Sequence, residues 1–354
     1  MPPDRGRGET PPVLAVDGGN SKADAVLMDR SGAILGLARH FGRSNVGGSG
    51  SIDALNDVIT AACAAARIDA GGRPVASVGI YCLAGADLPT DNRRIERALG
   101  ERGWTRRTMV HNDTFAVLRA GTDRGWGVAV VCGAGMNCVG VGPTGRTVRF
   151  AALGPLSGDL APGGEWVGLA ALSAAIRAGD GRGERTQLER TVPEHFGMRH
   201  AESVMHAMYR GRLPSARLVE LPPLVFRAAA SGDVVARRIL DQLASEVVSM
   251  AGAAIRRLRL TRSDVDVVLG GGMFRADDPV FLGRVRSGIE EAAPRCTVVR
   301  LEAPPLLGAA LMGLDAIGAS RRAEVRLRES IGRAMAAAER RLRAARQGAS
   351  SKGR

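Results

Sequence analysis

The sequence predicts an α/β protein built from two lobes, each with a mixed β-sheet flanked by helices. Three observations lead to this fold class. The chain has 354 residues, which is more than most single hydrophobic cores accommodate. In its first third, apolar runs and amphipathic stretches follow the order β-β-β-α-β-α-β, which favours a mixed sheet covered by helices. The strand–glycine turn–strand pattern that opens this third returns at residues 125–142.

The first element is a hairpin at residues 13–29. An apolar run ends in Asp17, and a second run begins after the turn Gly18-Gly19-Asn20-Ser21-Lys22. Adjacent glycines leave backbone N–H groups uncovered, and Lys22 adds a cation. Such a turn suits a phosphate, with Asp17 holding Mg²⁺ through water. The alternative interpretation is an ordinary hairpin tip, because Gly-Asn turns are common in hairpins.

The rest of the first lobe alternates strands with helices. We expect strands at 32–39, 75–83 and 108–111, and helices from 51, at 91–99 and at 114–120. Residues 40–50 form a glycine- and serine-rich loop. Asn45 in this loop could present an amide to a hydroxylated ligand, or the loop could be plain surface. The strand at 108–111 runs into Asn112-Asp113-Thr114, which places a carboxylate at a strand end.

The second lobe repeats the opening pattern and adds helices. Its glycine turn is Gly133-Ala134-Gly135, and two such turns could grip one polyphosphate from both sides. A loop with Asp159 and Glu165 leads into a helical region, and Gly270-Gly271-Gly272 follows a buried strand at 265–269. The predicted organisation is a lead at 1–12, lobes at 13–118 and 119–318, and a basic helical tail at 319–354.

Composition and charge exclude several classes of protein. The formal net charge is +13, but residues 321–354 alone carry +8, so the rest of the chain is too weakly basic to predict a nucleic-acid platform. The longest apolar stretch is broken by glycines and the start has no apolar signal segment, so no membrane partner is predicted. Five cysteines without a C-x-x-C pair favour reduced thiols and a cytoplasmic location.

The basic tail shows a helical pattern with few apolar residues. Val325, Leu327, Ile331 and Met335 are the apolar positions, and they suggest that the helix docks loosely or projects. The favoured interpretation is a solvated terminal helix, and contact with nucleic acid or an acidic surface is the minor alternative.

In their order along the chain, these motifs resemble a known family. The chain is similar to the N-acetylglucosamine kinase branch of the sugar kinase/Hsp70/actin superfamily, also called the BadF/BadG/BcrA/BcrD ATPase-like group. The matching segments are DGGNSK at 17–22, SN at 44–45, ND at 112–113, GAGMNC at 133–138, GD at 158–159, GGG at 270–272 and LGAA at 307–310. The resemblance implies two ribonuclease-H-like lobes of the actin-like ATPase fold, with ATP in the cleft between them.

The resemblance also implies roles for individual residues. The first turn and Gly133, Ala134 and Gly135 would hold the phosphates, and Gly271 and Gly272 would lie by the adenosine. Asn45, Asn137 and Asp159 would hydrogen-bond the sugar, and Asp113 would be the general base. The implied activity is ATP-dependent phosphorylation of N-acetylglucosamine or a related amino sugar, and a homodimer is the expected assembly. The structural alternative is that Asp113 only caps the helix beginning at Thr114.

Departures from the family pattern keep two other hypotheses open. Ala134 and Met136 replace the hydroxyl residues of the usual GTGSN turn, as in a sugar sensor that has lost turnover. Related ATPases activate acyl-CoA dehydratases and hold an iron–sulfur cluster through cysteines. Here Cys132 and Cys138 flank the turn, and we interpret them as small core residues. His195, His200 and His206 lack partners at metal-ligand spacing and are predicted to be surface residues rather than zinc ligands.

Overall fold

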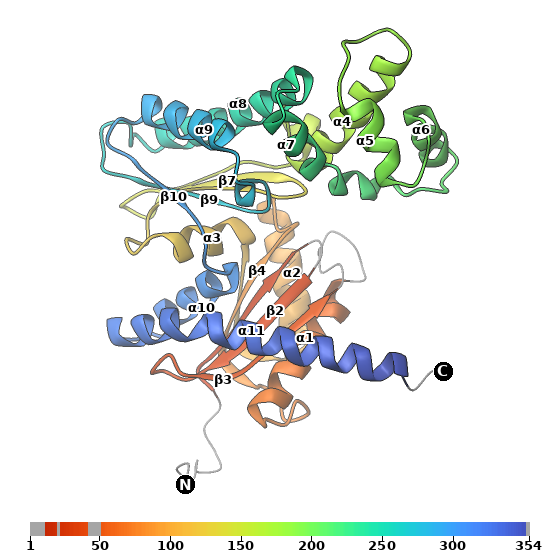
Figure 1. Ribbon diagram of the computed structural model, residues 1–354. Coiled ribbons are helices and arrows are strands. Elements are labelled where there is room, and N and C mark those ends of the chain that lie inside the picture. The colour runs from red at the N-terminus through yellow and green to blue at the C-terminus, as the bar shows by residue number, and fades with distance from the viewer. Residues whose placement is uncertain (1–10, 20–21, 42–50, 352–354) are drawn as a thin grey trace. The chain divides into compact units, whose positions relative to one another are not determined.

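The structure of the chain is a computed structural model that describes residues 11–19, 22–41 and 51–351 (Figure 1). The chain divides into two compact units. Unit 1 consists of Met1–Asp123 and Leu301–Arg354, and unit 2 is Arg124–Arg300. These boundaries differ from the predicted lobes because the chain returns to the first unit after residue 300.

Unit 1 contains a mixed sheet of five strands within the described residues, in the order β3-β2-β1-β4-β5. The hairpin pairs β1 with β2 in antiparallel fashion, β3 extends it, and β4 and β5 run parallel to β1. The strands are β1 Val13–Gly18, β2 Lys22–Met28, β3 Ile34–Phe41, β4 Ala76–Leu83 and β5 Thr105–Asn112. The helices are α1 Ser51–Ala66, α2 Pro89–Glu101, α3 Asp113–Gly121, α10 Pro305–Ala316 and α11 Arg321–Ser351.

Unit 2 repeats this topology, with its described strands in the order β10-β9-β6-β7-β8. The strands are β6 Gly127–Cys132, β7 Met136–Val141, β8 Thr147–Arg149, β9 Asp266–Gly270 and β10 Thr297–Arg300. The helices are α4 Gly164–Gly179, α5 Leu188–His195, α6 Ala201–Tyr209, α7 Pro222–Ala230, α8 Val234–Arg257 and α9 Pro279–Ala292, with short 3₁₀ helices at Gly154–Ser157, Ser215–Glu220 and Met273–Arg275. The predicted fold class, with its repeated strand–turn–strand opening, is therefore confirmed.

The third strand of unit 2 is short. The pattern of residues 147–153 indicates a strand throughout, but β8 ends at Arg149. Ala152 has a φ of 52°. This left-handed conformation is unfavourable in a strand, and it turns the chain into the 3₁₀ helix at Gly154–Ser157.

The sheet of unit 1 is buried on both faces. One face packs against α1 and α2 through residues such as Leu14, Leu27 and Ile59. The other face packs against α3, α10 and α11 through residues such as Val26 and Leu311. Alternate residues of β1 enter the two cores, which accounts for its continuous apolar run. This burial gives the strand ends next to the turn a rigid base.

The tail helix α11 is not the solvated helix that was predicted. Figure 1 shows it in dark blue, lying across the sheet of unit 1 beside β3. Every third or fourth residue along it is buried in the core of unit 1, namely Ala323, Leu327, Ile331, Met335 and Ala338. The prediction was wrong because small residues supply two of these five positions, and alanines among arginines give little apolar signal. Val325, which was counted as an apolar position, is 46% exposed.

Truncating Leu327 to alanine should destabilise unit 1. Leu327 is fully buried in the core beneath α11, so its loss leaves a cavity that typically costs about 2–5 kcal/mol. Val325→Ala, on the exposed side of the same helix, should change stability by less than about 0.5 kcal/mol. Thermal or urea unfolding of the two variants measures the difference, and equal midpoints would show that α11 is not docked.

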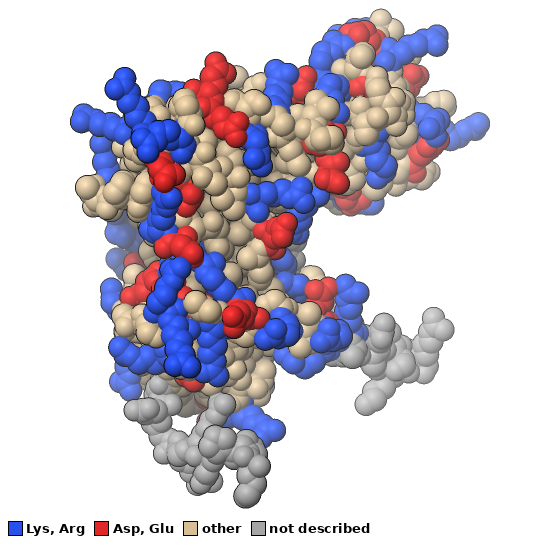
Figure 2. Space-filling view, turned by 60° about the vertical axis from the view of Figure 1, so that its left-hand side comes forward, with Lys and Arg blue, Asp and Glu red and all other residues tan. Residues whose placement is uncertain are grey.

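The surface of the described chain carries charged side chains of both signs (Figure 2). Within the described chain, no helix combines the length and apolar character needed to cross a bilayer. On the face seen in Figure 2, basic and acidic side chains are interspersed. Arginines of the tail also make contacts within unit 1. Arg321 and Arg328 pair with Asp123, and Arg341 donates to the Leu37 carbonyl.

Candidate active site

The first glycine turn joins β1 to β2 as predicted. The register pairs Asp17 with Asp24 and Gly18 with Ala23, and the Gly19 N–H donates to the Lys22 carbonyl at 2.9 Å. Asp17 therefore belongs to the second residue pair from the turn, and its side chain is buried. The predicted site residues Asn20, Ser21 and Asn45 lie outside the described residues.

Five polar or titratable side chains form one row across the sheet of unit 1. Asp17 is opposite Asp24 on β2 and opposite Cys82 on β4. Asp24 is opposite Arg39 on β3, and Cys82 is opposite His111 on β5. Because paired residues on neighbouring strands project from the same face, the row lies on the face that α3, α10 and α11 cover.

Asp24 in this row is held by an arginine. The Nε and Nη2 atoms of Arg39 donate to the two carboxylate oxygens of Asp24 at 2.7 and 3.0 Å. Asp24 is 1% exposed, and a buried carboxylate needs such a partner to remain charged. The Lys22 ammonium approaches the same carboxylate at 4.0 Å. Lys22 thus has a carboxylate neighbour rather than pointing only to solvent.

The environment of Asp17 favours a cation beside it. Burial, followed by the charges of Asp24 and Asp113, raises the pKa of Asp17 to about 8, against the opposing effect of Lys22 and Arg39. Since Arg39 occupies the Asp24 carboxylate, Asp17 is the carboxylate in this row that a metal ion would neutralise. Hard oxygen donors of this kind suit Mg²⁺, which keeps several water ligands and takes one or two carboxylates. The residues therefore fit Mg²⁺ at Asp17.

Asp113 lies at the first position of α3, directly after β5. The structural alternative, that Asp113 caps this helix, is wrong: the N-cap is Asn112, whose Oδ1 accepts from the Thr114 N–H at 3.1 Å and from its hydroxyl at 2.5 Å. The Nδ2 group of Asn112 also donates to Asp87 at 2.9 Å. Burial raises the pKa of Asp113 to about 6, and the charge of Asp87 is the next cause. A carboxyl with this pKa titrates close to neutral pH, as a general base should.

The second glycine turn, between β6 and β7, is fixed by α4. The Gly133 carbonyl accepts from the Gly164 N–H at 2.8 Å, and the Ala134 carbonyl accepts from the Glu165 N–H at 2.9 Å. A side chain at Gly163, whose φ is 100°, would come within 2.5 Å of the Gly135 backbone. In contrast, a Cβ at Gly133 or Gly135 would meet nothing within 4 Å. The outer surface of the turn is therefore open.

Neighbouring residues of this turn belong to the core of unit 2. Met136, Cys132 and Cys138 are at most 4% exposed and pack in one hydrophobic cluster. The prediction that both cysteines are core residues is confirmed, and burial raises the pKa of Cys132 to about 12. Gly271, with a φ of 103°, approaches the Cys132 carbonyl so closely that a Cβ would lie 2.3 Å from it. Gly271 is thus required for strand packing, whatever else it contacts.

The predicted sugar-binding residues of unit 2 differ in their surroundings. Asp159 is 8% exposed, and one carboxylate oxygen accepts from the Ser157 hydroxyl at 2.7 Å. Ser157 also accepts from the Leu153 N–H, so this loop is held by its own side chains. The Asn137 Oδ1 accepts from the Cys138 N–H at 2.7 Å.

The structure brings the predicted residues together in two groups. Unit 1 gathers Asp17, Lys22 and Asp113 around the end of β1, and unit 2 gathers the second turn with Gly271 and Gly272 at the ends of β6 and β9. Sequence reasoning missed Asp24, Arg39 and Asp87. The hairpin offered a signal for Asp24. Six residues separate it from Asp17, and the two residues lie opposite each other once Gly18 pairs with Ala23.

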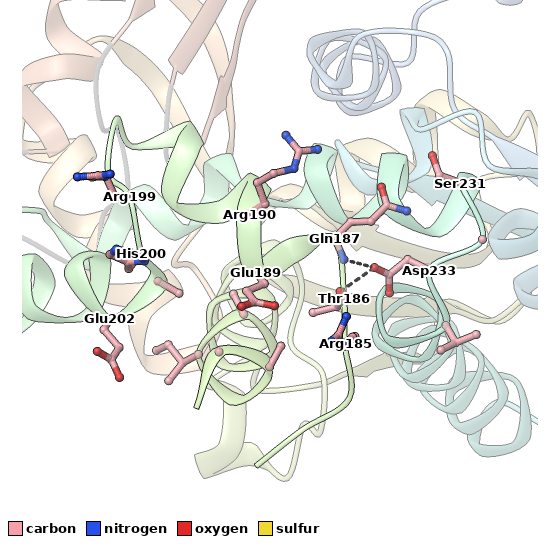
Figure 3. A pocket seen from close by; sticks show the side chains of 17 residues that line it. Arg185, Thr186, Gln187, Glu189, Arg190, Arg199, His200, Glu202, Ser231 and Asp233 are labelled. Atoms are coloured by element: carbon pink, nitrogen blue, oxygen red, sulfur yellow. Dashed lines mark hydrogen bonds between the residues drawn. The ribbon is translucent and has the colours of Figure 1, made fainter. Parts of the chain in front are cut away.

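A cavity in unit 2 contains none of the predicted site residues. It has a volume of about 1030 Å³ and lies among α4, α5, α6 and the start of α8 in unit 2 (Figure 3). Its charged lining is mixed and includes three arginines and three carboxylates: Arg185, Arg190, Arg199, Glu189, Glu202 and Asp233. Asp233 is occupied as the N-cap of α8 and accepts from Thr186 and Gln187. Asp233 therefore has a structural role at this cavity, because it joins the start of α8 to residues 186–187.

The histidines near this cavity are surface residues, as predicted. His195, His200 and His206 are exposed, and His195 bonds to Glu220 at 2.9 Å. Among the described residues there is no group of three or more His, Cys, Asp or Glu side chains arranged to bind a metal ion. A zinc or iron–sulfur site built on such a group is not present in this part of the chain.

Comparisons with known proteins agree with the two-unit fold. An N-acetylmuramic acid/N-acetylglucosamine kinase of Clostridium acetobutylicum is 25% identical over 305 residues, which cover 85% of this chain and 97% of the relative. An N-acetyl-D-glucosamine kinase of Dictyostelium discoideum is 26% identical over 315 residues, with the same coverage. A crystal structure described as a candidate N-acetylglucosamine kinase from Chromobacterium violaceum has a TM-score of 0.67 at 24% identity, covering 85% of this chain and 98% of that one.

The family follows from a match that spans most of the chain. The model of the BadF/BadG/BcrA/BcrD ATPase family covers residues 14–313, from β1 into α10. This segment contains both glycine turns and every described site residue discussed above. The predicted resemblance is confirmed, and the chain belongs to the BadF/BadG/BcrA/BcrD ATPase family.

Proposed function

We propose that this protein is an ATP-dependent kinase that phosphorylates a hydroxyl group of N-acetylglucosamine or a related amino sugar. The observation that carries the proposal is the position of Asp113 beside Asp17 at the turn end of the sheet, with helix capping left to Asn112. The two kinases to which the chain is similar over 85% of its length support the substrate class. Because the substrate is ATP, we place the protein in the cytoplasm.

Phosphoryl transfer depends on alignment and charge neutralisation more than on covalent chemistry. In the proposed mechanism, the first turn and the turn at 133–135 hold the phosphates through backbone N–H groups other than those of Gly19 and Gly133, which bond within their own turns. Lys22 offsets part of the phosphate charge. Asp113 accepts the proton of the sugar hydroxyl as that oxygen bonds to the γ-phosphorus, while the bond between the γ-phosphorus and the β–γ bridging oxygen breaks and ADP leaves. Asp17 would hold Mg²⁺, which neutralises phosphate charge when bound.

Sugar recognition would come from Asn137 and Asp159 of unit 2, with Asn45 of unit 1. The Ser157 hydroxyl holds Asp159 in place, which would orient its carboxylate for a sugar hydroxyl. Gly271 and Gly272 would lie beside the adenosine, where the absence of side chains allows close approach. Each of these roles is part of the proposal and can be tested by substituting the residue.

The sensor hypothesis loses part of its support. It rested on the loss of hydroxyl groups at Ala134 and Met136. The Met136 side chain, however, is buried in the core of unit 2, away from the open surface of the turn. The Gly133 N–H donates to the Gly135 carbonyl at 2.8 Å within the turn. Phosphate binding by this turn would therefore rely on the N–H groups of Ala134 and Gly135, and a side chain is absent at Gly135.

A kinase assay across a panel of sugars tests the proposal. The purified protein receives Mg·ATP with N-acetylglucosamine, N-acetylmuramic acid, glucosamine or glucose, and ADP release and phosphorylated product are followed. We expect ADP release that depends on an N-acetylated or amino sugar. ATP hydrolysis at the same rate with and without sugar would contradict a kinase and favour an ATPase. Sugar binding in a calorimeter without ADP release would favour a sensor.

Two glycine substitutions should separate ligand binding from folding. Gly135→Ala adds a methyl group that meets no protein atom within 4 Å, so it should leave stability nearly unchanged. If the turn holds phosphate, the methyl group should raise KM for ATP by about tenfold or more. Gly271→Ala is the contrasting variant, because its Cβ would lie 2.3 Å from the Cys132 carbonyl oxygen and should destabilise unit 2. Unfolding midpoints and KM measured for both variants check this, and an unchanged KM in Gly135→Ala would remove the turn from the phosphate site.

A further inference from the structure

The tail helix α11 contacts the site of unit 1 from outside the family match. The match ends at residue 313, and α11 begins at Arg321. Near its far end, Glu339 accepts a hydrogen bond from the Arg39 Nη1 atom at 3.0 Å. Arg341 donates to the Leu37 carbonyl of the same strand at 3.1 Å. These contacts belong to a segment that the family pattern does not include.

Arg39 is the link between the tail and the first turn. Its Nη1 atom faces Glu339, while its Nε and Nη2 atoms hold both oxygens of Asp24. The Arg39 side chain is 11% exposed and that of Asp24 is 2% exposed, so the pair is shielded from water. A guanidinium has a planar fork of donors, and occupying it from two sides leaves it little freedom to rotate.

Asp24 connects Arg39 to the proposed phosphate turn. It is paired across the hairpin with Asp17, and its carboxylate is 4.0 Å from the Lys22 ammonium. Two carboxylates opposite each other on neighbouring strands repel, and the repulsion would push the strand ends apart without a neutralising cation. Arg39 supplies that cation for Asp24. The orientation of Arg39 therefore affects where the carboxylate of Asp24 and the ammonium of Lys22 can lie.

The other end of α11 is tied to the helix that carries Asp113. Glu324 pairs at 3.0 Å with Arg119 of α3, and Arg328 donates to the Ala120 carbonyl at 2.9 Å. Arg119 also makes a two-pronged contact with Asp315 of α10. One helix thus bridges β3, whose Arg39 holds Asp24 of the hairpin, and the helix that begins with Asp113.

We propose that α11 braces the nucleotide site of unit 1, with Glu339 and Arg39 as positioning residues: Glu339 orients Arg39, and Arg39 fixes Asp24 beside the first turn. The proposal rests on the proposed function, because the turn is taken to bind ATP. Neither residue touches the reacting atoms. Their loss should therefore weaken the binding of Mg·ATP more than it slows the chemical step.

The test compares Glu339→Gln with Glu329→Gln, an exposed glutamate on the same helix. Arg39→Lys is a second variant, which keeps the charge but loses the planar fork. Calorimetry gives Kd for Mg·ATP without sugar, and steady-state kinetics give KM and kcat. We expect Glu339→Gln and Arg39→Lys to raise Kd and KM for ATP by about 2- to 30-fold with kcat nearly unchanged, and Glu329→Gln to match the wild type.

The outcomes separate the two proposals. If the wild-type protein neither binds Mg·ATP nor phosphorylates a sugar, the proposed function is refuted. The proposed role of α11 depends on that function and is then refuted as well. If the wild type is active and both positioning variants keep its Kd and KM, the brace alone is refuted. A lower unfolding temperature in Glu339→Gln with unchanged Kd would also refute it, since the contact would then serve only stability.

Discussion

Replacing Asp113 with asparagine is expected to lower kcat for sugar phosphorylation by about two to four orders of magnitude. Asparagine has nearly the same shape but cannot accept the hydroxyl proton. The fold should survive, because Asn112 rather than Asp113 supplies the capping hydrogen bonds of α3. Affinity for ATP should stay near the wild-type value. Steady-state kinetics and calorimetric titration with ATP measure the two effects separately, and a variant that turns over at the normal rate excludes Asp113 as the base.

The pH profile provides an independent check on the same residue. Burial, followed by the charge of Asp87, raises the pKa of Asp113 to about 6. The base form exists above this value, so kcat/KM should fall as the pH drops through about 6. Asp87→Asn removes the second cause and should move the inflection to lower pH. An inflection near 6 that persists in Asp113→Asn would have to come from another group.

Replacing Asp17 with asparagine should abolish activity and yet stabilise the metal-free protein. The carboxylate is the proposed ligand of Mg²⁺, so the variant should bind Mg·ATP much more weakly. Without a metal ion, the same carboxylate is a buried charge with Asp24 and Asp113 nearby. Asparagine removes this charge at nearly constant volume. An increase in Tm of about 1–2 °C at pH 8 corresponds to roughly 1 kcal/mol in a chain of 354 residues.

The sign of this effect follows from proton linkage. The pKa of Asp17 is raised from 3.8 to about 8 in the folded state. Between these values the folded chain holds more protons than the unfolded chain, so stability falls as the pH rises through this range. The Asp17→Asn variant lacks this pH-dependent loss of stability. The difference between its Tm and that of the wild type should therefore increase from pH 5 to pH 8. Asp57→Asn, an exposed carboxylate on α1, is the control and should show no such trend. A constant difference for Asp17→Asn would contradict the burial argument.

Much of the fold could be predicted because local patterns determine it. The apolar runs on both sides of Gly18 and of Gly133 define two hairpins, and the structure has both. The spacing of Ile239, Leu243 and Val247 defines α8. These features depend on residues close together in sequence, whose side chains must share one face of a helix or strand. The family motifs could be recognised in the sequence for the same reason, since each lies in a single turn or strand end.

The tail shows where local patterns failed. The buried side of α11 includes Ala323 and Ala338, which fit closely against the sheet but carry little hydrophobic signal. A Cβ at Gly32, at the turn between β2 and β3, would lie 2.2 Å from the Ala323 carbonyl oxygen. Close packing of this kind depends on the shape of both partners, and the sequence of one partner does not reveal it.

The sequence by itself determined the two hairpin turns, the order of strands and helices, and Asp17 and Asp113 as the acidic residues at strand ends. Only the tertiary structure placed Glu339 against Arg39, three hundred residues apart, and gave the cap of α3 to Asn112 rather than Asp113. Strand order and helix docking decide which distant side chains meet. Burial then decides how strongly their charges interact, because a carboxylate removed from water depends on the partners that the fold provides.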